Sequence, residues 1–111
     1  MTDRELLELA AKAAGYQISF DEQVNNYYPH GYDDNGDVDE WWNPLIDDGK
    51  ALRLAVKLDI YFMTVVEQGH VTARVRNGDR VGFHESMGAD PCAATRRAIV
   101  RAAAEIGKAM P

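Results

Sequence analysis

Three stretches of the chain place apolar residues at helical spacing, with capping signals at their ends. The first covers residues 2–14, where Thr2 and Glu5 have the spacing of a capping box and Gly15 provides a stop. Its expected buried face consists of Leu6, Leu9, Ala10 and Ala13, widened by Leu7, Ala11 and Ala14. This pattern predicts an amphipathic helix over residues 2–14.

The other two helical stretches begin at aspartates. Asp47 or Asp48 can cap the second helix, which we expect to run to about Leu58. Asp90 caps the third, and Pro91 fits its first position, where a backbone N–H would have no partner anyway. The expected apolar stripe of the second helix is Leu52, Ala55 and Val56, spread further by Leu54 and Leu58. That of the third is Ala94, Ala98, Ile99, Ala102, Ala103, Ile106 and Met110. The small side chains of the third helix predict close packing on a sheet.

Alternation of apolar and polar residues predicts four strands, one in residues 16–20 and three in residues 60–86. A one-residue shift in the pairing of two strands would move the side chains of one strand to the opposite face of the sheet. The positions of the apolar residues therefore indicate the register. A three-residue loop at residues 77–79 pairs Val75 with Val81, and Ala73 with Phe83. A two-residue turn at Gln68 and Gly69 pairs Val66 with Val71, Thr64 with Ala73 and Phe62 with Val75.

The two faces of this meander differ in chemistry. One face carries the apolar residues Val71, Ala73, Val75, Val81 and Phe83. The other carries Tyr61, Met63 and Val65, followed by Thr72, Arg74, Arg76, Arg80, Gly82 and His84. We expect the first face to form the core and the second to be mixed, apolar on one strand and basic on the other two.

These elements predict an α+β fold with a four-stranded, mainly antiparallel sheet and three helices. The expected order is helix, strand, long loop, helix, three strands, helix. A chain of 111 residues is one domain, here 1–111, and can bury a core without disulfides or metal. The single Cys92, the charged start of the sequence and the short apolar run at residues 60–66 predict a soluble cytoplasmic protein without a signal peptide or membrane span.

Charge is concentrated in residues 21–48, which hold nine of the 18 acidic residues and no Lys or Arg. The same segment holds Tyr27, Tyr28, Tyr32 and both tryptophans, Trp41 and Trp42. A long aromatic-rich connection in a compact domain is usually functional or disordered, and the tryptophans argue against disorder of the whole segment. We expect ordered ends, with one tryptophan packed, and a mobile middle at residues 33–39.

The overall net charge of −6 argues against binding of nucleic acid, although Arg74, Arg76 and Arg80 offer a basic face for it. The acidic segment and the basic second half of the chain can also neutralise each other within one fold. Charge alone therefore leaves internal pairing and a partner surface both open.

Two separated motifs resemble the phage ABA sandwich domain family. The first is Trp42-Asn43-Pro44-Leu45, continued by Asp47-Asp48-Gly49, then Ala51-Leu52-Arg53-Leu54-Ala55. The second is Asp90-Pro91, followed by Ala93-Ala94 and Arg96-Arg97-Ala98-Ile99-Val100. The resemblance covers most of the chain and is thinnest over residues 24–40. It implies a small phage or prophage protein with an α/β/α sandwich-like fold, and it implies no activity.

The acidic cluster at residues 33–40 does not fit a calcium loop. Counting from Asp33 puts Val38 at the sixth position, where glycine belongs, and Pro44 at the twelfth. Counting from Gly31 fits Gly36 but loses the first and last ligands. The sequence therefore predicts a solvated acidic turn and no metal site.

Candidate catalytic chemistry is sparse. His84 would lie beside Thr72, Arg74 and Arg76 on the basic face, where a neutral imidazole is favoured and can act as a base. Cys92 lies in the first turn of the third helix, where a thiolate is favoured, and it can equally be a small packed residue. No phosphate loop, zinc spacing or catalytic triad is present. We therefore predict no catalytic residues and no cofactor.

These observations favour a non-enzymatic phage or prophage accessory protein that binds a host or phage protein. The expected contact is the acidic aromatic segment, through Tyr27, Tyr28, Tyr32, Asp33, Asp37, Trp41 and Trp42. The alternative is a small enzyme or small-molecule binder with a pocket between this segment and the meander, using His84, Arg74 and Arg76. A deep pocket would favour the alternative, and a flat exposed aromatic patch would favour the binding module.

Overall fold

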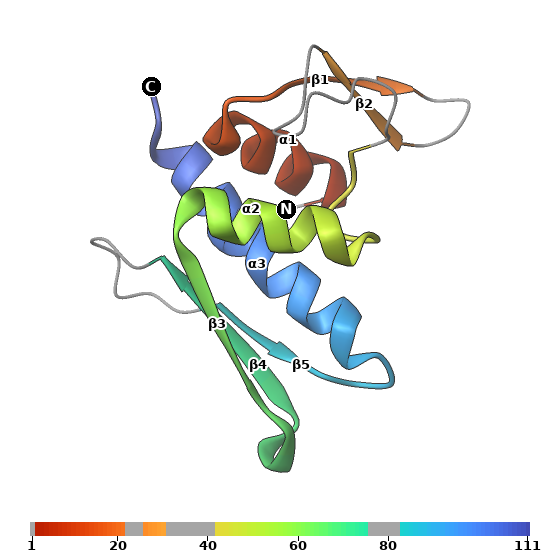
Figure 1. Cartoon of the computed structure of the whole chain (residues 1–111), viewed down its shortest axis with the longest axis vertical. Coiled ribbons are helices and arrows are strands. Elements are labelled where there is room, and N and C mark those ends of the chain that lie inside the picture. Colours follow the sequence, from red (N-terminus) through yellow and green to blue (C-terminus); the bar gives the residue numbers. More distant parts are fainter. Residues whose placement is uncertain (1, 22–25, 31–41, 76–82) are drawn as a thin grey trace.

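The computed structural model describes residues 2–21, 26–30, 42–75 and 83–111 (Figure 1). Its elements, in chain order, are α1 (Asp3–Ala14), β1 (Gln17–Asp21), β2 (Asn26–His30), α2 (Asp48–Leu58), β3 (Ile60–Val65), the 3₁₀ turn η1 (Val66–Gln68), β4 (His70–Val75), β5 (Phe83–Ser86) and α3 (Pro91–Ala109). The predicted α+β class and the three predicted helices are confirmed. No helix among these residues is long and apolar enough to cross a membrane.

The helix ends follow the predicted capping residues. Thr2 Oγ1 accepts a hydrogen bond from the Glu5 N–H at 3.1 Å and donates one to the Glu5 carboxylate at 3.2 Å. Gly15 ends α1 with φ +80°, a backbone conformation that favours glycine. The Asp47 carboxylate caps α2 by accepting from the Lys50 N–H at 2.8 Å, and that of Asp90 accepts from Ala93 N–H at 3.0 Å.

Helix α3 is the centre of the molecule. It contacts β3, β4 and β5 on one side and α1 and α2 on others (Figure 1). Its buried residues are therefore spread around the helix: Ala94, Ala98, Ile99, Val100, Ala102, Ala103, Ala104 and Gly107. Of the stripe expected from the sequence, Ile106 is only half-buried and Met110 is exposed. The small residues of α3 let several elements approach one helix.

The buried face of α2 differs from the predicted one. Leu52 and Val56 are 55% and 75% exposed, whereas Ala51, Leu54 and Ala55 are buried. The helix carries two overlapping apolar stripes, and only one can face α3. The structure buries the stripe made of small residues and Leu54, which leaves two large apolar side chains on the surface.

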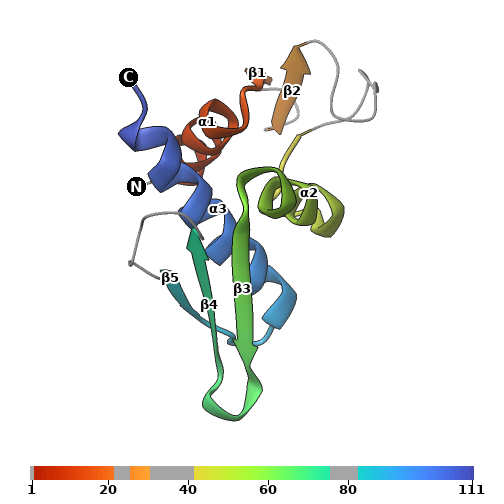
Figure 2. The same ribbon diagram turned by 60° about the vertical axis from the view of Figure 1, so that its left-hand side comes forward.

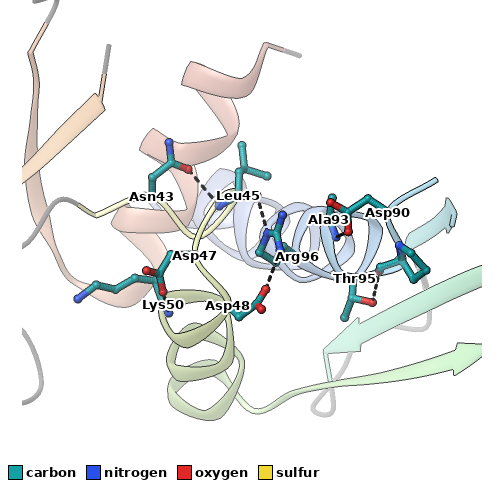
Figure 3. Close-up of polar contacts among 10 residues, drawn as sticks. Asn43, Leu45, Asp47, Asp48, Lys50, Asp90, Ala93, Thr95 and Arg96 are labelled. Atoms are coloured by element: carbon teal, nitrogen blue, oxygen red, sulfur yellow. Dashed lines mark hydrogen bonds and ion pairs between the residues drawn. The ribbon is translucent and has the colours of Figure 1, made fainter. Parts of the chain in front are cut away.

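An arginine on α3 holds the start of α2 in place (Figure 3). Arg96 Nε donates to the Leu45 carbonyl at 2.8 Å, and its guanidinium contacts the Asp48 carboxylate at 2.6 Å. The Asn43 side chain accepts from the Leu45 N–H at 3.0 Å, which shapes the turn before the helix. Trp42 anchors the same segment, because it is buried and its ring lies edge-on to that of Tyr16 at 5.8 Å.

The second hairpin of the meander has the predicted register where it is described. Ala73 lies opposite Phe83, as expected, and Thr72 opposite His84. The predicted pair of Val75 and Val81 cannot be compared, because Val81 lies outside the described residues, which stop at 75 and resume at 83. The apolar face with Val71 and Ala73 joins the core, as predicted.

The first hairpin is shifted by two residues from its predicted register. Phe62 lies opposite Ala73 rather than Val75, and Thr64 opposite Val71. The connection is longer than a two-residue turn, because η1 and Gly69 separate the paired residues Val65 and His70. A two-residue shift of the register leaves each side chain on the same face of the sheet, so the predicted assignment of residues to faces is still correct.

The predicted four-stranded sheet is wrong. β1 pairs with β2 in a separate two-stranded antiparallel sheet, and the other sheet has three strands in the order β3-β4-β5. β2 lies in the segment expected to be a loop, and it gives β1 a partner close in sequence. The three-stranded sheet packs on the helices through the Val71 and Ala73 face (Figure 2). Among the described residues no helix covers its other face, so the sandwich with helices on both sides is not seen.

Candidate functional site

A hollow of about 510 Å³ lies on the outer face of the three-stranded sheet, the face turned away from the helices. All three strands and the η1 turn contribute to it. It is lined by Tyr61, Met63, Val65, Gln68, His70, Thr72, Arg74 and His84. Its floor is the flat surface of the sheet, so the position of each side chain follows from strand register and alternation.

Cross-strand pairs organise the hollow. Tyr61 lies directly opposite Arg74, Met63 opposite Thr72, and Val65 opposite His70. Residues opposite each other in an antiparallel pair are close enough for their side chains to interact. An aromatic ring thus neighbours a guanidinium at one end of the β3–β4 pair, and an apolar side chain neighbours an imidazole at the other.

Two histidines and a threonine contact one another in the site. Thr72 Oγ1 and His84 Nδ1 are hydrogen-bonded at 2.8 Å across β4 and β5. The rings of His70 and His84 meet edge to face, with centroids 5.8 Å apart. Thr72 is only 8% exposed, whereas His84 is exposed. The Thr72 bond holds the His84 ring by one nitrogen and leaves Nε2 as the ring atom for other contacts.

Among the described side chains that line this hollow, Arg74 carries the one permanent charge, and none is a carboxylate. Two acidic residues adjoin lining residues in sequence, Glu67 beside Gln68 and Glu85 beside His84. Glu85 accepts from Arg101 on α3 at 2.8 Å, on the helix side of the sheet. The site therefore combines a cation, two imidazoles and the apolar surface of Met63 and Tyr61. Such a lining suits a ligand that carries negative charge.

The structure places the predicted site residues in different environments. Tyr27 and Tyr28 lie in β2, opposite Phe20 and Ser19. Trp42 is 4% exposed and belongs to the core, so this tryptophan of the segment is packed. Tyr32, Asp33, Asp37, Trp41 and Arg76 lie outside the described residues, as do the middle of the acidic segment and the expected pocket between that segment and the meander.

Arg74 and His84, predicted to share a face, do line one hollow. Sequence reasoning did not select His70 and Gln68. His70, Thr72 and Arg74 lie two residues apart along one strand, so alternation places them on the same face, and this signal could have identified His70. Gln68 reaches the site from the η1 turn, which the alternation pattern did not reveal.

A second, smaller hollow of about 280 Å³ lies on the opposite side of β3, between α2, β3 and the first half of α3. It is almost wholly apolar and is lined by Asp48, Ala51, Leu52, Phe62, Thr64, Cys92, Thr95, Arg96 and Ile99. Cys92 is exposed there, at the start of α3. Within the described ranges, no three His, Cys, Asp or Glu side chains are grouped closely enough to hold a metal ion.

Comparison of the chain with protein-family models, with characterised proteins and with solved structures finds no match.

Proposed function

We propose that this protein is a non-enzymatic binding module that takes an acidic segment of a partner protein on the outer face of its three-stranded sheet. The observation that carries the proposal is the hollow on this face, which brings Arg74, His70 and His84 together and has no carboxylate among its described lining residues. A guanidinium can form two parallel hydrogen bonds to one carboxylate, and imidazole nitrogens can accept or donate further ones. Tyr61 and Met63 add apolar contact area beside these groups.

The geometry favours binding over catalysis. The pair formed by Thr72 and His84 has the distance of a nucleophile and its general base, 2.8 Å. In such sites a third group normally orients the base, and the described residues that line this hollow offer no carboxylate for that role. Thr72 is also nearly buried, and it faces His84 as an ordinary cross-strand pair.

Two parts of the proposal rest on the sequence. The acidic aromatic segment, residues 21–48, supplies a second contact of opposite charge, directed at a basic surface of a host or phage protein. We also propose an origin in a phage or prophage, on the resemblance of two motifs to the phage ABA sandwich domain family, and a cytoplasmic location, on the single Cys92.

The test of the sheet surface is titration of a labelled peptide of glutamate and serine into the purified protein. We expect Arg74→Ala to weaken binding about tenfold or more, because a hydrogen bond between charged groups contributes about 1.5–3 kcal/mol. Arg53→Ala is the matched control, since it removes the same charge from the exposed side of α2. An equal loss of peptide affinity in both variants would mean that only the net charge of the protein matters, and would contradict the proposal.

An anionic small molecule is a second candidate ligand for the same surface. The hollow of about 510 Å³ is within the size range of ligand pockets. Citrate would then displace the acidic peptide, and the amide signals of His70 to Arg74 would shift in an NMR titration with citrate alone. Displacement by sodium chloride at equal ionic strength would instead indicate screening.

A further inference from the structure

Strand β3 forms an edge of the three-stranded sheet. Among the described strands it pairs with β4 alone, so no described strand lies along its other side. Such an edge is a template for another strand, and proteins usually block it with a charged residue, a proline or a bulge. β3 reads Ile60-Tyr61-Phe62-Met63-Thr64-Val65 and contains neither a charge nor a proline.

The opposite edge strand, β5, has the protection that β3 lacks. It has only four residues, and one of them is Glu85. The Arg101 side chain reaches it from α3, donating to the Glu85 carboxylate at 2.8 Å and to the His84 carbonyl at 3.3 Å. The two edges of the described sheet therefore differ: β3 is the longer strand and has no charged side chain, whereas β5 is short and carries Glu85.

Large apolar side chains are exposed around the β3 edge. Phe62 and Met63, on opposite faces of the strand, are 39% and 61% exposed. Leu52 on α2 is exposed as well and lines the smaller hollow together with Phe62 and Thr64. The apolar surface continues from both faces of β3 onto α2, which is the surface that an added strand with its own side chains would cover.

We infer that two copies of this chain associate through their β3 edges, in antiparallel orientation, and form one continuous six-stranded sheet. A two-fold axis perpendicular to the sheet places the same face of both copies on the same side. Residues opposite each other must therefore point to the same face, which means that their numbers differ by an even number or are equal. A register centred on Met63 satisfies this condition. It places Met63 opposite Met63 of the second copy, Phe62 opposite Thr64, and Tyr61 opposite Val65. Ile60, which is buried in the core beside the end of α2, stays outside the pairing.

The added strand is β3 of a second copy because the β3 sequence is suited to pair with itself. An uncharged strand rich in aromatic and β-branched residues pairs well with an identical strand. The two-fold arrangement also closes, because each β3 edge satisfies the other and β5 is guarded against further growth. In this register Phe62 and Thr64, which line the smaller hollow, gain the second copy's Thr64 and Phe62 as neighbours.

The experiment measures the mass of the purified protein over a range of concentrations by sedimentation. We expect a dimer in the wild type. Met63→Lys and Met63→Glu should each weaken it about tenfold or more, because like charges would face each other at the two-fold axis. An equimolar mixture of M63K and M63E should restore the dimer, because Lys and Glu then lie opposite each other. Ser86→Lys, an exposed position on the other edge strand, is the matched control and should leave the dimer intact.

A wild type that stays monomeric at all concentrations, a dimer that survives both Met63 substitutions, or an equal loss in S86K would each overturn the inference. Failure of the mixture to restore the dimer would overturn the register centred on Met63. Sedimentation uses no ligand, so these outcomes are independent of peptide binding by Arg74.

Discussion

Gly107 allows α3 to cross α1 in contact with its backbone. A Cβ atom at this position would collide with the carbonyl oxygen of Leu9. That oxygen belongs to the backbone of a helix and cannot move aside as a flexible side chain can. Glycine in the middle of a helix is otherwise unfavourable, so its presence here is explained by this close approach.

Replacing Gly107 by Ala should therefore destabilise the protein by about 1–3 kcal/mol, the usual range for overpacking. The measurement is a urea unfolding midpoint compared with that of the wild type. Gly49→Ala is the control, because its Cβ would meet only the Asp47 side chain at 3.3 Å. That variant should stay within about 1 kcal/mol of the wild type. Equal destabilisation in both would mean that α1 and α3 are not in contact at Gly107.

Two neighbouring arginines on α3 differ in their surroundings. The Arg96 side chain is 15% exposed and bonds both Leu45 and Asp48, whereas Arg97 is 38% exposed and pairs with Asp3. We expect Arg96→Ala to lower the free energy of unfolding by about 1.5–3 kcal/mol, and Arg97→Ala by less than about 1 kcal/mol. Urea denaturation of both variants tests this. A larger loss in R97A would contradict the role of Arg96 in positioning α2.

Single residues were predictable where the cause is local. Thr2, Gly15 and Asp90 act within one turn of their own helix, and each has the role expected from sequence. The exposure of Leu52 was not predictable, because α2 has two apolar stripes and the choice between them depends on the shape of α3. Trp42 illustrates a middle case, since the sequence favoured one packed tryptophan without identifying which.

At the scale of elements, the strands of the meander were predictable and their partners less so. Alternation along each strand predicted which residues share a face of the sheet. This prediction is correct even in the hairpin whose register is shifted by two residues. β2 was missed because Asn-Tyr-Tyr-Pro-His lacks alternation and contains a proline, both typical of a loop. Without β2, the sequence offered β1 no partner except the distant meander, and this produced the error of a fourth strand.

The packing of α3 between the sheet and the other helices predicts unequal effects along it. Ile99 is buried at 2% exposure, whereas Ile106 lies at the margin of the core. Ile99→Ala should cost about 2–5 kcal/mol of stability, and Ile106→Ala clearly less, because a half-buried side chain loses fewer contacts. Thermal and urea midpoints of the two variants provide the measurement. Similar losses would place both isoleucines in the same environment and contradict the packing of α3.

At the scale of the whole molecule, the sequence located a surface but not the hollow in it. His84, Thr72 and Arg74 could be assigned to one face, because alternation fixes faces. Whether a helix covers that face depends on how α1, α2 and α3 distribute around one another, and no local pattern encodes it. The same holds for the β3 edge, because strand order in the sheet is not encoded by alternation.

The packing of α1 on α3 has a consequence for how the chain is made. α1 ends at Ala14 and α3 begins at Pro91, so a ribosome completes α1 long before its partner exists. At about 5–20 residues per second the delay is roughly 4–16 s, far longer than helix formation itself. During that time Leu6, Leu7, Ala10 and Ala11 have no core to enter. The apolar face of this segment therefore has no α3 to pack on until α3 is made, and we expect the nascent chain to engage chaperones at this segment until then.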